Sequence, residues 1–362
     1  MAADTPSLDR KHIRPGDRVC AAASGGVDSV AMLLLLAAEN TLAKNALGVG
    51  LSAVHVHHGL RREEADTDLA FVEQLCLRLE VPLHVHRASV PDRLAAGANP
   101  ARNETVEEAA RILRYEVFER LIREGHADTV LTAHTLDDQA ETVLIKLLRG
   151  AWTEGLSGIF PVLKVEGERS GKPGNIVRPL LGIRRKELED YLRGCGQTWR
   201  TDSTNADEAY TRNRIRHHLL PILREYNPAI DRTLANLAEL ARDDEVKWQA
   251  ELSRVLPQLL LPGKPVRGGG RSVSTAGDGE TIGIEIERVR GLDPATVRRV
   301  LRAAARRVGG RMDFSDTQKL LDLMSSGTGR SVAKLHLSGG LRAERTPREL
   351  RLSRASRAGK SV

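Results

Sequence analysis

A glycine-rich stretch, Ser24-Gly25-Gly26-Val27-Asp28-Ser29, lies between a small apolar run, Val19–Ala23, and a helix-forming run, Val30–Ala38. This pattern predicts a strand, a tight loop and the start of a helix. Adjacent glycines let the backbone approach a ligand, and N–H groups at a helix start attract an anion, above all a phosphate. All six residues are therefore candidate nucleotide-binding residues. Asp28 is in addition a candidate ligand for Mg²⁺ carried on the phosphates.

The loop is not a Walker sequence, because no G-x-x-x-x-G-K-[ST] occurs in the chain. An ordinary strand–helix turn, with glycines for packing, is the alternative interpretation. The Asp-Ser pair within the loop favours the nucleotide site. The loop resembles the pyrophosphate-binding loop of the N-type ATP pyrophosphatases, which split ATP into AMP and pyrophosphate while adenylating a substrate oxygen.

The composition limits the kind of protein. A length of 362 residues predicts two or three domains, and a hydrophobic share of 41% suffices for buried cores. The three cysteines, Cys20, Cys76 and Cys195, form no C-x-x-C motif, which is typical of thiols in a reducing cytoplasm. The longest apolar run, Val30–Ala38, is far shorter than the about 20 residues of a membrane span. We therefore expect a cytoplasmic protein without a secretion signal or membrane segment.

The charge distribution points to a polyanionic partner. The net charge is +7 and the isoelectric point is near 9.5. Residues 338–362 hold seven Lys and Arg against two Glu, a local charge of +5, whereas the rest of the chain is nearly balanced. The basic character is thus concentrated at this end of the sequence.

Strand and helix patterns alternate after the loop. Strands are expected over Val49–Val56, Leu83–His86 and Thr129–Ala133, and helices over Ala65–Leu79, over 103–124 with Asn103 as its cap, and over Arg184–Arg193. The alternation predicts an α/β fold, a Rossmann-like parallel sheet with helices on both faces, in which ligands bind at the carboxyl ends of the strands.

Acidic residues follow the third of these strands. Thr135 and Asp138 have the spacing of a capping box for a helix that ends near Gly150. Asp138 and Glu141 are three residues apart, so they share a face of that helix with Asp137. Carboxylates at a helix start are also favoured by the helix dipole alone. Their position after a sheet strand places them at the same edge as the loop, where a metal–ATP site would form.

The C-terminal part has a different composition. The segment 262–278 is rich in Gly, Pro and Ser and predicts a flexible linker after a helix-rich stretch. Beyond it we expect a strand over 281–286, helices over 294–307 and 314–324, and a hairpin of 332–337 with 341–352 around Ser338-Gly339-Gly340. The arginines at every third position from Arg342 to Arg357 fit neither strand nor helix cleanly, and past the hairpin we expect a frayed basic tail.

Seven motifs together resemble the tRNA(Ile)-lysidine synthase family, in the order found there, over about residues 18–230. They are Ser24–Ser29, His55–Arg61, Glu108–Tyr115, Ala133–Thr142, Arg178–Leu181, Asp202–Asn205 and Arg212–Arg216. The likeness is weaker from residue 280 on. Two features depart from the family pattern: His134-Thr135 stands where two histidines are usual, and the glycine-rich linker is longer.

The resemblance implies a reaction. ATP activates the C2 carbonyl oxygen of the wobble cytidine in a tRNA(Ile) with a CAU anticodon, and the amine of free L-lysine then displaces AMP. It also implies four parts: a catalytic domain over 1–215, a helix-rich tRNA-contacting segment over 216–261, a linker over 262–280, and a small α+β tRNA-binding domain with a basic tail over 281–362. A homodimer stays open as an alternative to a monomer.

The resemblance also suggests roles for individual residues. Asp28, Asp138 and Glu141 are the candidate catalytic residues. Asp28 and Asp138 are candidates for Mg²⁺, while Asp138 and Glu141 can instead bind the lysine ammonium. His55 and Arg111 join the loop as candidate ATP-binding residues, although Arg111 can equally be a solvated helix charge. The candidate tRNA-binding residues are Arg212, Arg214, Arg216, Arg342 and Arg345.

Two other functions compete. A tRNA sulfurtransferase uses the same adenylation, but such enzymes rely on cysteine pairs, and this chain has no C-x-x-C. A nucleotide-binding module without turnover would keep the loop but would need neither the carboxylates around Asp138 nor a basic tail.

Overall fold

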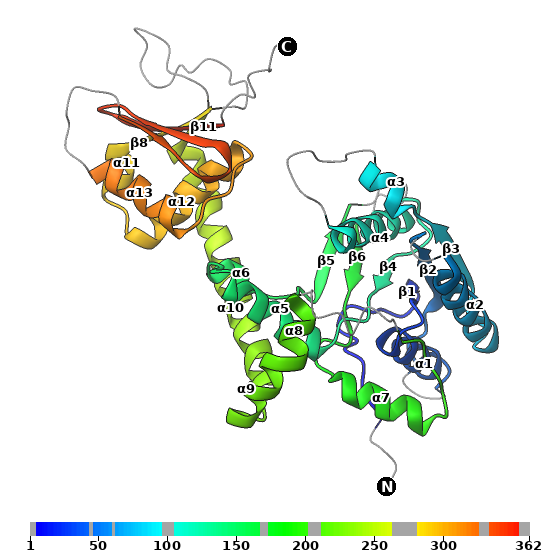
Figure 1. Cartoon of the computed structure of the whole chain (residues 1–362). Coiled ribbons are helices and arrows are strands. Elements are labelled where there is room, and N and C mark those ends of the chain that lie inside the picture. Colours follow the sequence, from blue (N-terminus) through cyan, green and yellow to red (C-terminus); the bar gives the residue numbers. More distant parts are fainter. Residues whose placement is uncertain are drawn as a thin grey trace. The chain divides into compact units, whose positions relative to one another are not determined.

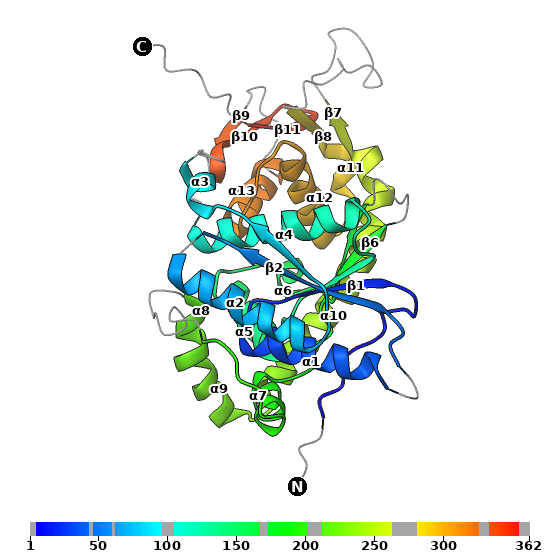
Figure 2. The ribbon, with the colours of Figure 1, turned by 90° about the vertical axis from the view of Figure 1, so that its right-hand side faces the viewer.

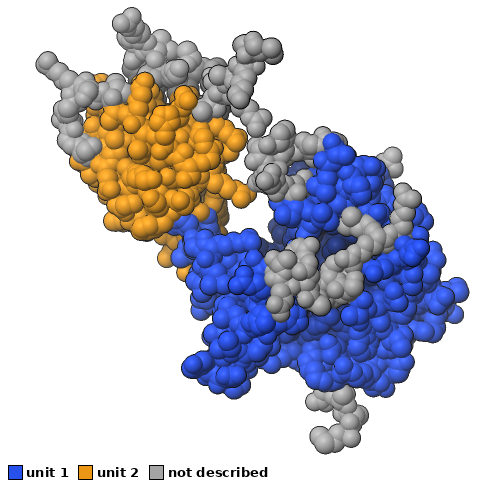
Figure 3. Space-filling view, viewed as in Figure 1, with its two compact units in different colours: residues 1–243 blue, residues 244–362 orange. Residues whose placement is uncertain are grey.

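The computed structural model describes residues 5–42, 46–59, 62–95, 105–166, 173–201, 211–262, 281–325 and 333–354. It divides into two compact units, residues 1–243 and residues 244–362 (Figures 1 and 3). The boundary falls within one long helix, α10 (Ile230–Leu259).

The first unit is built on a six-stranded sheet with the order β3-β2-β1-β4-β6-β5. All neighbours pair in parallel except β5, which runs antiparallel to β6 at the edge. The strands are β1 (Arg18–Ala22), β2 (Gly50–His57), β3 (Leu83–Arg87), β4 (Thr129–Leu131), β5 (Val162–Val165) and β6 (Gly174–Val177). The chain leaves β1 toward β2 on one side, whereas β4 lies on the other side, so the carboxyl ends of β1 and β4 flank a topological switch point.

Helices cover both faces of this sheet (Figures 1 and 2). On one face, α1 (Val27–Asn40), α2 (Arg62–Arg78) and α7 (Arg185–Gly194) share a core with β1 that includes Met32, Val72 and Leu188. On the other face, α4 (Val106–Arg123) packs Phe118 and Leu121 against the sheet. The short helix α3 (Val90–Ala95) precedes α4. The α/β sheet with helices on both faces is thus confirmed.

A separate helical core lies within the first unit. Here α5 (Leu136–Leu148) packs against a continuous helical stretch made of α8 (Thr211–Arg214), a π-helical turn (Ile215–Leu219) and α9 (Leu220–Tyr226), and against the start of α10. The short α6 (Thr153–Leu156) packs beside α5. The division predicted at residue 215 runs through this shared core, since Ile215 and Leu220 are both buried in it.

The second unit is a five-stranded antiparallel sheet backed by helices. The strand order is β7-β8-β11-β10-β9, with β7 (Leu260–Pro262), β8 (Thr281–Glu285), β9 (Ala333–His336), β10 (Leu341–Arg345) and β11 (Glu349–Arg354). Its helices are α11 (Ile286–Arg290), α12 (Pro294–Arg307) and α13 (Phe314–Ser325). Val300, Leu320 and Leu352 are fully buried in the core between sheet and helices.

The structure corrects two local expectations. Thr105 is the N-cap of α4, where its side chain accepts the Glu108 N–H at 3.2 Å, while Asn103 lies outside the described residues. The hairpin around Ser338–Gly340 is present, with Gly339 and Gly340 in the left-handed region at φ +66° and +76°. However, 341–352 is not one strand, because the chain turns back and pairs β10 with β11. Of the arginines at every third position, Arg342 and Arg345 therefore lie in β10, Arg351 and Arg354 lie in β11, and Arg348 lies in the turn between the two strands. The predicted tail beyond that residue and most of the predicted linker lie outside the described residues.

Within the described ranges, no helix combines the length and the apolar character that crossing a membrane requires.

Candidate functional site

The loop after β1 has the geometry of an anion site. Gly25 has φ +87°, a left-handed conformation that other residues rarely adopt, and a Cβ atom there would lie 3.4 Å from Arg200 Cγ. Gly26 is the N-cap of α1, and as a glycine it has no side chain with which to cap this helix. The N–H groups of its first turn thus point into the loop without a capping oxygen, as phosphate binding requires.

The two serines of the loop hold its shape. Their hydroxyl oxygens lie 3.1 Å apart, Ser29 Oγ donates to the Gly26 carbonyl at 2.9 Å, and the Ser24 N–H donates to Ser29 Oγ at 3.2 Å. Val27 is buried in the core beneath, so it offers a ligand only its backbone. A β-bridge from Gly26 to Arg200 fixes the loop from the other side. Arg200 itself is held by Asp68 of α2 at 2.9 Å.

Asp28 lies in the first turn of α1 with unusual surroundings. Its side chain is 19% exposed, and Oδ1 is buried without a hydrogen bond from any described residue. Oδ2 receives one contact, from Arg185 Nη1 at 3.2 Å. Burial raises the pKa of Asp28 to about 7, opposed by Arg185 and reinforced by Asp138. An orphaned carboxylate oxygen beside a phosphate loop fits Mg²⁺, which proteins usually hold with one or two carboxylates and the substrate phosphates.

Asp138 and Glu141 lie close together but are already paired. Asp138 Oδ2 accepts the Thr135 N–H at 2.8 Å in the predicted capping box, which is confirmed, and Oδ1 accepts from Arg212 Nη2 at 2.8 Å. Glu141 is 0% exposed, and its two oxygens accept from Arg212 Nε at 2.7 Å and Arg216 Nε at 2.6 Å. Burial raises the pKa of Asp138, but Arg212 and the other donors together bring it below its usual value.

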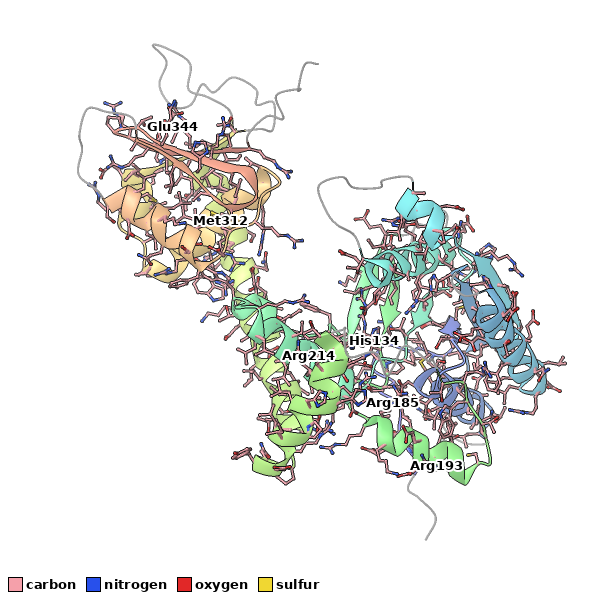
Figure 4. All side chains as sticks on the ribbon, in the orientation of Figure 1. His134, Arg185, Arg193, Arg214, Met312 and Glu344 are labelled. Carbon is pink, nitrogen blue, oxygen red and sulfur yellow. The ribbon has the colours of Figure 1, made fainter. Side chains whose placement is uncertain are left out.

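This pairing changes how four of the predicted site residues are understood. Arg212 and Arg216 face two acids rather than solvent, and a cation at Asp138 would have to displace Arg212. Arg214, labelled in Figure 4, lies between them in sequence and is exposed. Among the described residues, no cluster of three or more His, Cys, Asp and Glu side chains is arranged to hold a metal.

His55 is a buried, neutral histidine at the carboxyl end of β2. Its Nδ1 lies 2.8 Å from the Ala23 carbonyl, which can only accept, so Nδ1 carries the proton and Nε2 is the acceptor. Burial lowers the pKa of His55. The histidine thus fixes the end of β1 next to the loop.

His134, which follows β4, lies among the cationic side chains of Arg111 on α4 and Arg178 after β6. The Arg111 guanidinium lies 4.8 Å from the centre of the Tyr115 ring, and the Tyr115 hydroxyl accepts from buried Arg178 at 2.7 Å. Burial lowers the pKa of His134 to about 3, with Arg178, Arg111 and Arg212 acting in the same direction and Asp138 opposing them. His134 is therefore neutral at physiological pH.

The predicted residues of the second unit differ in accessibility. Arg342 is exposed, whereas Arg345, on the same strand, is 5% exposed. Leu341, Ala343 and Arg345 alternate onto the inner face of β10, so the structure places Arg345 in the interior. A phosphate contact is therefore open to Arg342 but not to Arg345 in this conformation.

Two residues at the loop were missed. Arg185 and Arg200 both contact it, although they lie more than 150 residues further along the chain. Arg185 lies four residues after a recognised motif, Arg178–Leu181, and within the predicted helix Arg184–Arg193, and these were the available signals. Arg200 precedes the Asp202–Asn205 motif, which lies outside the described residues.

A parallel α/β sheet with a glycine loop at its switch point and an uncapped helix behind the loop defines a nucleotide-binding domain of the pyrophosphate-loop class. The chain matches the PP-loop domain family over residues 5–223 and belongs to that family.

Curated relatives are named tRNA(Ile)-lysidine synthase. The protein from Solibacter usitatus is 39% identical over 319 residues, which are 87% of this chain and 63% of that protein. The protein from Deinococcus radiodurans is 41% identical over 251 residues, 69% of this chain and 38% of that protein. The protein from Thermus thermophilus is 42% identical over 258 residues, 70% of this chain and 46% of that protein. The chain thus spans less than two thirds of the length of these relatives.

Proposed function

We propose that this protein is a tRNA(Ile)-lysidine synthase. It ligates free L-lysine to C2 of the wobble cytidine of tRNA(Ile) with a CAU anticodon, through an adenylated intermediate, and releases AMP and pyrophosphate in the cytoplasm. The observation that carries the proposal is the similarity to enzymes of that name, which at 39% identity over 319 residues extends well beyond the nucleotide loop.

The geometry supports the first half-reaction. The N–H groups at the start of α1 supply preorganised donors for the pyrophosphate that departs from ATP, in a loop whose shape the two serine hydroxyls hold. Asp28 would hold Mg²⁺, which supplies charge neutralisation on the phosphates when bound. His55, near the carboxyl end of β2, and Arg111, on α4, contribute to ATP binding by hydrogen bonding and charge.

The second half-reaction needs a lysine-binding site and residues that bind tRNA. Asp138 and Glu141 are the acids on the ligand edge, and together with Arg212 and Arg216 they form a buried charge cluster that positions reacting groups. Exposed Arg214 and Arg342 are the proposed phosphate contacts to tRNA.

The cysteines do not favour the sulfurtransferase alternative. Burial raises the pKa of both Cys20 and Cys76 to about 11, so these thiols stay protonated, and Cys195 lies at the end of α7. Because a thiolate is the reactive form, Cys20 and Cys76 are poor sulfur nucleophiles, and exposed Cys195 has no second cysteine beside it in the sequence.

The direct test is incubation of tRNA(Ile) transcript with ATP and lysine, followed by mass spectrometry of the nucleosides. We expect lysidine, with AMP and pyrophosphate as co-products in equal amounts. Omission of lysine should leave adenylated tRNA without lysidine. Formation of ADP and phosphate, or of a thiolated cytidine when a sulfur donor replaces lysine, would exclude this function.

The basic surface of the second unit gives a separate prediction. Arg342→Gln should weaken tRNA binding and reduce the log–log salt slope by roughly 0.7 to 0.9, the value for one lost phosphate contact. ATP binding should not change. Substitution is preferable to truncation at Ser338, because β10 and β11 contribute buried Leu341, Leu350 and Leu352 to the core.

The matched control is Glu344→Gln on the same strand, labelled in Figure 4. Removing this acid should leave the salt slope unchanged or raise it slightly. If Arg342→Gln binds tRNA with the wild-type slope, this surface does not contact the nucleic acid.

A further inference from the structure

Arg185 reaches the nucleotide loop from a neighbouring helix. It is the first residue of α7, which packs against α1 on the same face of the sheet, and it is labelled in Figure 4. Its Nη1 lies 3.2 Å from Asp28 Oδ2, and Asp28 is in the first turn of α1. The guanidinium therefore lies at the N-terminal end of α1, where an anion would bind.

The backbone of Arg185 is fixed, whereas its side chain is held weakly. The Arg185 N–H donates to Asp137 Oδ2 at 2.8 Å, which ties the start of α7 to α5. The side chain makes one contact to Asp28, at 3.2 Å, and its Nε lies 3.7 Å from Glu189. In contrast, Arg212 and Arg216 contact Glu141 at 2.7 and 2.6 Å. The Arg185 side chain is one third exposed, so a ligand can reach its guanidinium.

Asp28 has an incomplete set of partners in this arrangement. Its Oδ1 is buried without a hydrogen bond among the described residues, and Oδ2 has only the single Arg185 contact. A buried carboxylate held by one long contact is poorly compensated. Both Arg185 and Asp28 would gain a stronger partner when a phosphate and its metal bind, because guanidinium binds phosphate and carboxylate binds the metal.

We propose that Arg185 is a phosphate-binding residue that changes partners. In the ligand-free protein it holds the Asp28 carboxylate, and with nucleotide bound it contacts the pyrophosphate portion of ATP and leaves Asp28 to the metal. The inference rests on the proposed function only in so far as that function requires ATP at this loop. It needs neither tRNA nor lysine.

The first measurement is calorimetric titration with inorganic pyrophosphate in the presence of Mg²⁺, using full-length protein. Arg185→Gln should weaken pyrophosphate binding by roughly tenfold or more, as expected for loss of one charge-assisted hydrogen bond, while adenosine binding stays unchanged. The control is Arg193→Gln on the same helix, whose partners are Glu189 and Asp190 and which does not contact the loop. It should bind pyrophosphate like the wild type.

The exchange of partners is tested by a double-mutant cycle without metal. Asp28→Asn releases Arg185 from its pair, so metal-free pyrophosphate should bind more tightly than to the wild type. The same Asp28→Asn substitution made in Arg185→Gln should give no gain in pyrophosphate affinity over Arg185→Gln alone. If the double variant binds pyrophosphate more tightly than Arg185→Gln by the same factor, the gain reflects only the lost negative charge, and the exchange of partners is overturned.

Arg185→Lys keeps the charge but not the planar guanidinium, and it serves if the glutamine variant does not fold. An intermediate loss of pyrophosphate affinity in Arg185→Lys supports the proposal, and wild-type affinity in Arg185→Gln overturns it. If the wild type itself binds neither ATP nor pyrophosphate, the proposed function fails. If the wild type binds both and Arg185→Gln binds equally well, only this inference fails.

Discussion

Asp28→Ala is expected to abolish lysidine formation, with a loss of roughly 10² to 10³-fold or more, while the protein remains folded. The carboxylate lies in the phosphate loop, and one of its oxygens is buried without a partner among the described residues. We therefore expect Asp28 to act through ligands that arrive with ATP, not through packing. The measurement is lysidine per enzyme by mass spectrometry, together with circular dichroism and the thermal midpoint of both proteins.

The same residue should limit stability in a pH-dependent way. The pKa of Asp28 is about 7 in the folded protein and 3.8 for the ordinary side chain, and burial is the main cause. The raised pKa stabilises the fold fully below pH 3.8, and this stabilisation is lost as the pH rises through 7. Relative to Asp28→Asn, the wild type should therefore lose up to about 4 kcal/mol of unfolding free energy between pH 4 and pH 8.

Asp190→Asn is the control for this pH series, because Asp190 lies on the exposed side of α7 and its pKa is lowered by Lys186. It should not show the loss. Wild-type lysidine formation by a folded Asp28→Ala protein would contradict the role of this carboxylate. If the unfolding free energies of the wild type and Asp28→Asn differ by a constant amount across the pH range, Asp28 is not a buried, poorly compensated carboxylate.

The fold and the loop were predictable because local sequence determines them. The glycine pair and the apolar runs beside it specify strand, loop and helix, and Thr135 with Asp138 specifies the start of α5. The boundary between the two units was harder to predict, because it lies inside α10, where no change of composition marks it.

The partners of the charged residues were not predictable from spacing. Arg212 and Arg216 alternate as a phosphate-binding stretch would, yet both contact Glu141, which lies about 70 residues earlier in the chain. Arg342 and Arg345 belong to the same series of arginines at every third position, but only Arg345 lies on the inner face of the strand. Such pairings depend on how distant elements pack, and a single sequence does not contain that information.

Glu141→Gln should have the other large effect, on both stability and catalysis. Glu141 is fully buried and accepts from Arg212 and from Arg216, so the substitution leaves two half-buried guanidiniums with less compensating charge. Breaking a buried ion pair from one side costs about 3 to 5 kcal/mol. We expect the unfolding free energy to fall by this amount in urea titrations. Glu189→Gln, which removes partly exposed pairs on α7, should cost under about 1 kcal/mol.

The catalytic consequence distinguishes two roles for Glu141. Lysine carries two ammonium groups and a carboxylate, and its attacking amine must be neutral when it reacts. A direct lysine contact predicts that Glu141→Gln slows lysidine formation and raises the KM for lysine, while adenylated tRNA still accumulates at the wild-type rate. The buried pairing predicts instead that both steps fall together, because Arg212 and Arg216 shift, and this is the result we expect. A stable Glu141→Gln protein with normal adenylation and a raised lysine KM would show that the arginines leave Glu141 during catalysis and that lysine takes their place.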